Sequence, residues 1–409
     1  MNELIEIIRR EISTRGIVSV ARFMELALYC PLYGFYEQES DTIGRRGDYY
    51  TNVSTGRLFG ELLAFQFVEW IESESGAQNE AHRNESGAWQ IVEAGAHDGR
   101  LAKDILAWLR FWRPEVFEEI EYWIVEPSLR RQKWQQETLS DFAPRVRWFA
   151  DLQSSRAQTA MVESNWRWGG GEWKSPPVRG VIFSNELLDA MPVHRFGWDA
   201  RGRKWFEWGV AASGDRFVWA RLPETPDAAR LAPRAPAELL NVLPDGYTIE
   251  LCPMAEEWWR SAALALGCGR LLTIDYGLTA EEALRPERRN GTLRAYHRHH
   301  PSRDVLENPG EQDITAHVNF STLQAVGESA GLKTNGLFTQ PQFLTKIAER
   351  VWKAGGRWGE WTPEKTRQFQ TLVHPEHLGR SFRVLVQSRR DSQFHCHRVP
   401  ADPQSGPNS

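Results

Sequence analysis

The chain has 409 residues, of which 41% are hydrophobic and 25% charged, and its formal net charge at pH 7 is −5. This composition is typical of a soluble globular protein with one large core or two ordinary ones, and the slight acidic excess argues against nucleic acid as the main partner. The four cysteines, Cys30, Cys252, Cys268 and Cys396, form no C-x-x-C pair, which indicates a reducing compartment and argues against a disulfide framework or a zinc ribbon.

Residues 1–75 are predicted to be mainly helical and to form a lid or substrate-binding segment. The first twelve residues carry Glu3, Glu6 and Glu11 among apolar side chains. This pattern predicts an amphipathic helix rather than a signal peptide or an acid-poor transit peptide. No apolar run in the chain is long enough to span a bilayer. We therefore expect a cytoplasmic enzyme.

Residues 89–390 alternate between strand-like and helix-like segments. Helices are expected at 99–110, 128–139, 254–266 and 320–330, and strands at 89–94, 121–126, 146–149, 180–184, 270–275 and 382–387. This alternation predicts an α/β, Rossmann-like fold, in which a mostly parallel sheet is covered by helices on both faces. In such folds the ligand lies at the carboxyl ends of the strands.

The most informative segment is the loop that follows the strand at 89–94. It carries Glu93, Gly95, His97 and Gly99 and leads into an amphipathic helix. The glycines let the backbone approach a ligand closely, and the helix N-terminus directs free N–H groups toward the loop. Nicotinamide-dependent oxidoreductases carry G-x-G-x-x-G instead and bind a pyrophosphate there, which the carboxylate of Glu93 disfavours. That carboxylate favours a cationic, phosphate-free ligand, and S-adenosylmethionine fits this description.

Polar residues follow the next strands as well. Glu126 comes at the end of the second strand, before Pro127 and Ser128, and is well placed to accept the hydroxyls of a ribose. Pro127 and Ser128 are also expected to contact the cofactor. Ser128 is at the same time a candidate N-cap of the following helix, and the two roles are compatible. Asp151 comes after the third strand and could accept a hydrogen bond from the amino group of an adenine, and Leu152 beside it is also expected to contact the cofactor.

The fourth strand runs into Asn185, Glu186 and Asp189. We expect Asn185 to contact the cofactor. Buried carboxylates are costly unless they meet a cation or hydrogen-bond donors, so we predict that Glu186 and Asp189 face a basic group of the substrate. The alternative is a capped helix start that is closed by Pro192.

Three other regions carry weaker signals. Insertions are expected at 195–248 and 277–312, and residues 391–409 are predicted to be a disordered tail. His297, His299 and His300 lie beside arginines, which repel cations, and we predict no metal site. The chain has neither the G-x-S-x-G elbow of hydrolases nor a Walker A motif.

Several ordered blocks resemble the MidA-type family of S-adenosylmethionine-dependent methyltransferases. They are YCPLYGFY (29–36), GRRGDYYT (44–51), FGEL (59–62), the loop at 93–99, VEPSLR (125–130), SNELLDAMPV (184–193), IDYG (274–277), GTLRAY (291–296) and QDITAHVNF (312–320). The resemblance implies a Rossmann-like methyltransferase fold and S-adenosylmethionine as the cofactor. It also implies an arginine of a protein as the methyl acceptor, and the mitochondrial relative suggests a subunit of a respiratory complex as that protein. The chain departs from the family at His97, where glycine is usual, and at Asn52 and Val53, where Thr51 is usually followed by Ser-Pro.

Arginine is a poor nucleophile because its side chain stays protonated, with a pKa above ~12. A pair of carboxylates can bind the guanidinium through two hydrogen bonds and hold its charge away from the third nitrogen. Glu186 and Asp189 are the predicted pair. Two alternatives stay open, namely a methyltransferase of small molecules and a non-catalytic assembly factor whose cofactor loop is impaired by His97. The sequence leaves the oligomeric state undefined.

Overall fold

The computed structural model describes residues 3–38, 51–76, 88–152, 177–234, 236–297, 300–302 and 304–390. The family block at 44–50, His299 and the predicted tail at 391–409 lie outside these ranges. Within the described residues, no helix is both long and apolar enough to cross a membrane.

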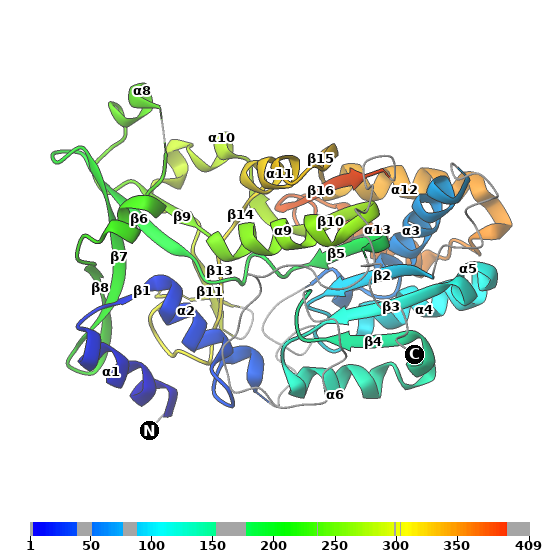
Figure 1. Cartoon of the computed structure of the whole chain (residues 1–409), viewed down its shortest axis with the longest axis horizontal. Coiled ribbons are helices and arrows are strands. Elements are labelled where there is room, and N and C mark those ends of the chain that lie inside the picture. Colours follow the sequence, from blue (N-terminus) through cyan, green and yellow to red (C-terminus); the bar gives the residue numbers. More distant parts are fainter. Residues whose placement is uncertain are drawn as a thin grey trace, which may run out of the picture.

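A mixed, mostly parallel sheet forms the centre of the fold (Figure 1). Its strands in spatial order are β15 (Lys333–Thr339), β16 (Phe382–Arg389), β10 (Leu266–Leu278), β5 (Val178–Asn185), β2 (Trp89–Ala94), β3 (Ile120–Val125) and β4 (Val146–Phe149). The strands from β10 to β4 run parallel, and β16 is antiparallel to both of its neighbours. The short β14 (Val318–Asn319) pairs with the end of β10. The predicted α/β fold is therefore confirmed, and each of the six predicted strands is present.

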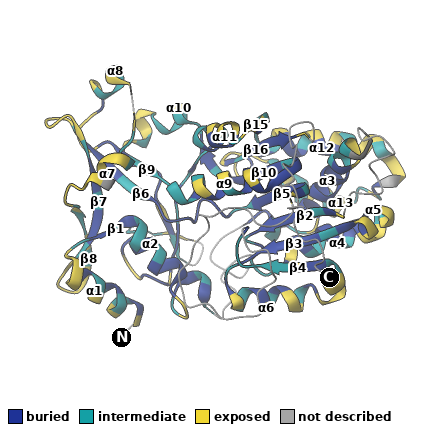
Figure 2. Cartoon of the chain, in the orientation of Figure 1, coloured by how far each residue is buried: buried dark blue, intermediate teal, exposed yellow. Residues whose placement is uncertain are grey.

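The sheet is buried on both faces because its apolar side chains alternate between two cores. In β2, Ile91 packs into one core and Val92 into the other. The first core lies under α3 (Leu58–Gly76), α4 (Arg100–Trp112), α12 (Gln340–Ala354) and α13 (Pro363–Val373), and the second under α9 (Pro253–Ala265) and α11 (Phe320–Ser329). Figure 2 shows the strands largely in the colour of buried residues, with exposed residues on the outer sides of the helices.

A second, antiparallel sheet lies at the opposite end of the molecule from the mostly parallel sheet (Figure 1). It contains β1 (Val18–Ser19), β7 (Lys204–Ser213), β6 (His194–Asp199) and β9 (Thr248–Leu251), and β8 (Arg216–Arg221) pairs with β7. The N-terminal helices α1 (Glu3–Arg15) and α2 (Val20–Tyr29) pack against this sheet, and so do β11 (Arg294–His297) and β13 (Asp313–Thr315). Residues from the N-terminal segment and from both expected insertions thus share one core.

The order of the strands defines where a ligand can bind. From β2 the chain proceeds to β3 and β4 on one side, and β5 lies on the other side of β2. The loops that follow β2 and β5 therefore leave the sheet in opposite directions, and a crevice opens between them at the carboxyl ends of the strands.

Candidate functional site

The loop after β2 has a backbone that strongly favours glycine. Gly95, His97 and Gly99 have positive φ angles of 72°, 47° and 83°. The N–H of Gly95 donates to the carbonyl of Val125 at 3.1 Å, and a Cβ added to Gly95 would lie 2.8 Å from Cδ1 of Leu187. Any larger residue at position 95 would clash with this side chain. The loop is thereby held close to the ends of β3 and β5.

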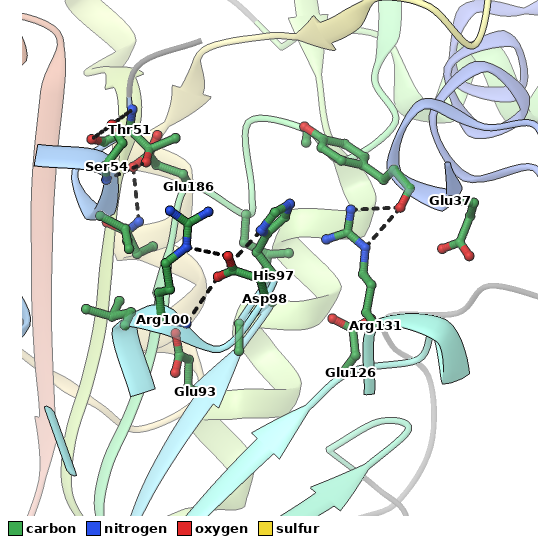
Figure 3. A pocket seen from close by; sticks show the side chains of 18 of the residues that line it. Glu37, Thr51, Ser54, Glu93, His97, Asp98, Arg100, Glu126, Arg131 and Glu186 are labelled. Carbon is green, nitrogen blue, oxygen red and sulfur yellow. Dashed lines mark hydrogen bonds and ion pairs between the residues drawn. The ribbon is translucent and has the colours of Figure 1, made fainter. Parts of the chain in front are cut away.

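A cavity of about 970 Å³, its open mouth included, lies at this edge of the sheet. Six of the predicted site residues line it, namely Glu93, Gly95, His97, Asn185, Glu186 and Glu126. In Figure 3, Glu186 and Glu126 lie on opposite sides, with His97 and Asp98 between them. The cavity is open to solvent and combines apolar and charged side chains in its wall, as small-molecule sites commonly do.

Glu93 forms the floor of the cavity. Its side chain is buried at the end of β2, and the hydroxyl of Tyr122 donates to its Oε2 at 2.6 Å. Burial raises the pKa of Glu93 to about 8, although the hydrogen bond from Tyr122 acts in the opposite direction. The carboxyl is therefore largely protonated at pH 7, and a cationic ligand group beside it would favour its ionised form.

Glu126 lies directly after β3 and is held by α6 (Leu129–Thr138). Its Oε1 accepts the backbone N–H of Ser128 at 2.9 Å, and its Oε2 accepts the side-chain amide of Gln135 at 3.2 Å. Burial raises its pKa to about 7, and the charge of Arg131 opposes this shift. Ser128 also caps α6, because its Oγ accepts the N–H of Arg131 at 3.4 Å. Ser128 is thus an N-cap and at the same time a contact of Glu126.

The side chain of His97 lines the cavity rather than pointing away from the loop. Its Nδ1 lies 3.8 Å from Oδ1 of Asp98, which also accepts the backbone N–H of Arg100 at 3.1 Å. Burial alone would raise the pKa of Asp98, but the hydrogen bond from His97 and the charge of Arg100 bring it well below its usual value. An ionised carboxylate therefore lies beside His97 in the cavity wall.

Glu186 occupies a strained position at the end of β5, with a φ of 52°. Its Oε1 accepts the backbone N–H of Asn52 at 2.9 Å and the side-chain amide of Asn185 at 3.1 Å. The amide of Asn52 donates to Asn185 at 3.2 Å, and Gln340 donates to Asn52 at 2.8 Å. This chain of amides donates toward the carboxylate and fixes its orientation.

The structure does not bring Asp189 to the cavity wall. Asp189 is 2% exposed and its carboxyl is hydrogen-bonded to that of Asp275. The strand end turns sharply at Glu186, so Asp189 lies behind the wall instead of beside Glu186. Of the predicted pair, only Glu186 lines the cavity, so the structure does not place Glu186 and Asp189 together around a substrate group.

Other predicted cofactor residues also lie off the cavity wall among the described residues, namely Gly99, Pro127, Ser128, Asp151 and Leu152. Gly99 is the N-cap of α4, and Leu152 is buried in the core with Val92. Gly99 and Ser128 thus serve the start of a helix, and Leu152 serves the core, rather than the wall of the cavity.

Several residues that line the cavity were not predicted. They are Asp98, Arg100, Arg131, Thr51, Ser54, Tyr29, Tyr36 and Glu37. Asp98 lies within the glycine loop and Arg100 directly follows it, so this loop was the sequence signal that could have indicated both residues. Tyr29, Tyr36 and Glu37 come from the N-terminal segment and only reach the cavity through the tertiary fold.

Comparisons with known proteins agree with this geometry. Residues 62–338 match a family described as "Putative S-adenosyl-L-methionine-dependent methyltransferase". The chain is similar to the mouse protein named protein arginine methyltransferase NDUFAF7, mitochondrial, at 29% identity over 403 residues, which covers 92% of this chain and 82% of that protein. It is also similar to the Drosophila melanogaster homolog of that methyltransferase, at 27% identity over 93% of this chain and 83% of the fly protein.

A crystal structure of a protein from Burkholderia thailandensis, bound to S-adenosyl-homocysteine, has the same fold. The two chains are 30% identical with a TM-score of 0.74, and the match covers 95% of this chain and 92% of that chain. A native crystal structure of a protein of the same superfamily, also from Burkholderia thailandensis, is 29% identical to this chain and aligns with a TM-score of 0.72 over 95% of this chain and 91% of that chain.

The expected cytoplasmic location is contradicted by these comparisons, because the mouse and fly relatives are named as mitochondrial proteins. The acidic N-terminal helix is present as α1, but a helix that packs into the fold says nothing about the compartment. Dispersed cysteines without a C-x-x-C pair indicate a reducing environment, and more than one compartment provides it.

Proposed function

Because this chain belongs to the family of S-adenosyl-L-methionine-dependent methyltransferases, we propose that it methylates an arginine side chain of a protein. Methyl transfer and the cofactor follow from the family. The identity of the methyl acceptor as an arginine is a narrower proposal. It is supported by the names of the relatives and by the carboxylate of Glu186 on the cavity wall. We further propose, from the resemblance alone, that the substrate is a subunit of a respiratory complex.

The described residues fit the cofactor. Gly95 lines the cavity with a positive φ of 72°, a conformation that glycine adopts without strain and that turns the loop backbone toward the site. Glu93 offers a carboxyl to the cationic amino-acid end, and Glu126 offers one to the ribose hydroxyls. Both carboxyls are buried with raised pKa values, so each gains a partner for its ionised form when a ligand with these donors is present.

The bound cofactor supplies a methyl group on a positively charged sulfur. The role of Glu186 is to bind the guanidinium of the acceptor, with Oε1 fixed by Asn52 and Asn185. A carboxylate that is fixed on one side binds a planar guanidinium in one orientation. The positive charge is then held on the nitrogens that face Glu186. The remaining nitrogen would take the methyl group in line as the bond from sulfur to the methyl carbon breaks, and its proton would leave to solvent at the open mouth of the cavity.

One observation carries this proposal, namely that Glu186 is placed on the cavity wall by a strained turn and an oriented chain of amides. Backbone strain of this kind persists at functional sites because it positions a side chain. A methyltransferase of small molecules would use the same cofactor pocket and would not need a carboxylate fixed to receive a guanidinium.

The test is an assay with methyl-labelled S-adenosylmethionine and a protein extract, followed by complete hydrolysis of the labelled protein. We expect label in a protein band and recovery as methylarginine, and no such label with Glu186→Gln. A parallel reaction with a purified respiratory complex tests the narrower substrate proposal. Label that enters only low-molecular-weight compounds would contradict a protein acceptor.

A further inference from the structure

The short helix η1 (Phe35–Glu37) of the N-terminal segment forms part of the cavity wall. Tyr36 and Glu37 both line the cavity. Two arginines of α6 bind this segment: Arg131 donates to the carbonyl of Tyr36 through Nε at 3.1 Å and Nη2 at 2.9 Å, and Arg130 donates to the carbonyl of Glu37 at 2.5 Å. Figure 3 shows Arg131 between Glu37 and the rest of the cavity. The N-terminal segment is thereby attached to the helix that follows Glu126.

Glu37 brings a second carboxylate close to Glu126. Its side chain is 7% exposed, and its Oε2 accepts the hydroxyl of Ser128 at 3.1 Å. Ser128 at the same time donates its backbone N–H to Glu126, so one residue holds both carboxylates. Among the described residues, Oε1 of Glu37 has no hydrogen-bond partner although it is buried. A buried acceptor of this kind is costly unless a ligand or a water satisfies it.

The acceptor capacity of the two carboxylates differs. Each oxygen of Glu126 already accepts one hydrogen bond, from Ser128 and from Gln135. Glu37 has one oxygen that accepts none. A ribose presents two adjacent hydroxyl donors, and each carboxylate oxygen can accept two hydrogen bonds. Two carboxylates held by the same serine therefore match two neighbouring hydroxyls.

We propose that Glu37 is a cofactor-binding residue, which accepts one ribose hydroxyl of S-adenosylmethionine while Glu126 accepts the other. The N-terminal segment then completes the cofactor site in addition to any part it has in substrate binding. The proposal depends on the cofactor and not on the identity of the methyl acceptor.

Binding of S-adenosyl-homocysteine tests this, with calorimetric titration as the readout. The ligand is compared with its 2′-deoxy and 3′-deoxy analogues, on the unaltered protein and on Glu37→Met, which keeps the side-chain length and removes the acceptor. On the unaltered protein, loss of the hydroxyl that Glu37 accepts should weaken binding about tenfold. On Glu37→Met, loss of the same hydroxyl should change affinity less than about twofold.

Glu37→Gln serves as the second variant, because it keeps an acceptor and the contact with Ser128 and should retain sensitivity to that hydroxyl. Glu25→Met on α2, whose carboxylate pairs with Arg22 instead, is the control and should bind all three ligands as the unaltered protein does. Equal sensitivity to both deoxy analogues in Glu37→Met and in the unaltered protein would overturn the proposal. These titrations contain no methyl acceptor, so a negative result for Glu37 would leave the proposed arginine substrate untouched.

Discussion

The carboxyl of Asp189 is hydrogen-bonded to that of Asp275 behind the wall of the cavity. Asp275 accepts three backbone N–H groups, from Leu188 and Tyr276 at 2.8 Å and from Leu187 at 3.2 Å. Burial raises the pKa of both carboxyls, and the charge of Asp275 raises the pKa of Asp189 further, whereas the backbone donors and the hydrogen bond from Asp189 lower the pKa of Asp275. Since Asp275 has the donors, Asp275 carries the charge and Asp189 holds the proton.

Replacement of Asp189 by asparagine should therefore be tolerated. The amide of asparagine donates to Asp275 as the protonated carboxyl does, so we expect methyl transfer within about threefold of the unaltered enzyme. Asp275→Asn is the contrasting variant, because an amide cannot accept all of these N–H groups, and it should lower the free energy of unfolding by about 2 kcal/mol. Loss of transfer in a stably folded Asp189→Asn would restore Asp189 as a substrate-binding residue.

The elements of the central sheet were predictable because their patterns are local. The strand at 89–94 and the helix after Gly99 follow from apolar periodicity and from glycines at a turn. The antiparallel sheet was not predicted as one unit, since β1 pairs Val18 with Val210 across a large sequence separation. No local signal predicts such pairs.

The candidate site was predictable to a similar extent. Glu93 lies near the end of β2, and Glu126 and Glu186 directly follow β3 and β5, so the fold alone brings all three to one edge. Asp189 was misplaced because three more residues of irregular backbone separate it from β5, beginning with the positive φ of Glu186. Glu37 lines the cavity and Asn52 donates to Glu186 from the N-terminal segment, and no local pattern predicts contacts between parts of the chain that are so far apart.

Glu93→Gln should stabilise the protein without ligand, and the effect should depend on pH. Burial raises the pKa of Glu93 from 4.5 to about 8, so the folded state holds a proton that the unfolded state has lost over this range. The unaltered protein therefore loses stability relative to the glutamine variant as pH rises from about 4.5 to about 8, by on the order of a few kcal/mol in total.

Denaturant unfolding at several pH values between 5 and 9 measures this difference. Glu257→Gln on the exposed side of α9 is the control and should show no such increase. A difference between Glu93→Gln and the unaltered protein that stays constant over the whole range would contradict a neutral, buried Glu93.

Cofactor binding should release protons near pH 7. Glu93 and Glu126 have pKa values of about 8 and 7 because they are buried, and ligand donors favour their ionised forms. Affinity for S-adenosyl-homocysteine should then rise with pH between 6 and 8, and the calorimetric enthalpy should differ between buffers with different ionisation heats. Glu93→Gln should reduce both effects, and identical enthalpies in phosphate and Tris would rule out the proton release.

His97→Gly tests whether the departure from the family impairs the cofactor loop. The φ of 47° at His97 is one that glycine adopts without strain, so the loop backbone should not change. His97 forms part of the cavity wall beside Asp98, and we expect the affinity of His97→Gly for S-adenosyl-homocysteine to stay within about threefold of the unaltered protein. An affinity gain above tenfold in His97→Gly would mean that the histidine obstructs the site.

The assignment of Glu186 as the guanidinium-binding residue is tested most directly by Glu186→Gln, with transfer and cofactor binding measured on the same preparation. The glutamine oxygen can still accept from Asn52, so the fold and the dissociation constant for S-adenosyl-homocysteine should be retained within about twofold. Transfer of label to protein arginine should fall at least about a hundredfold, because the charge that orients the guanidinium is lost. Full transfer by this variant would contradict the account.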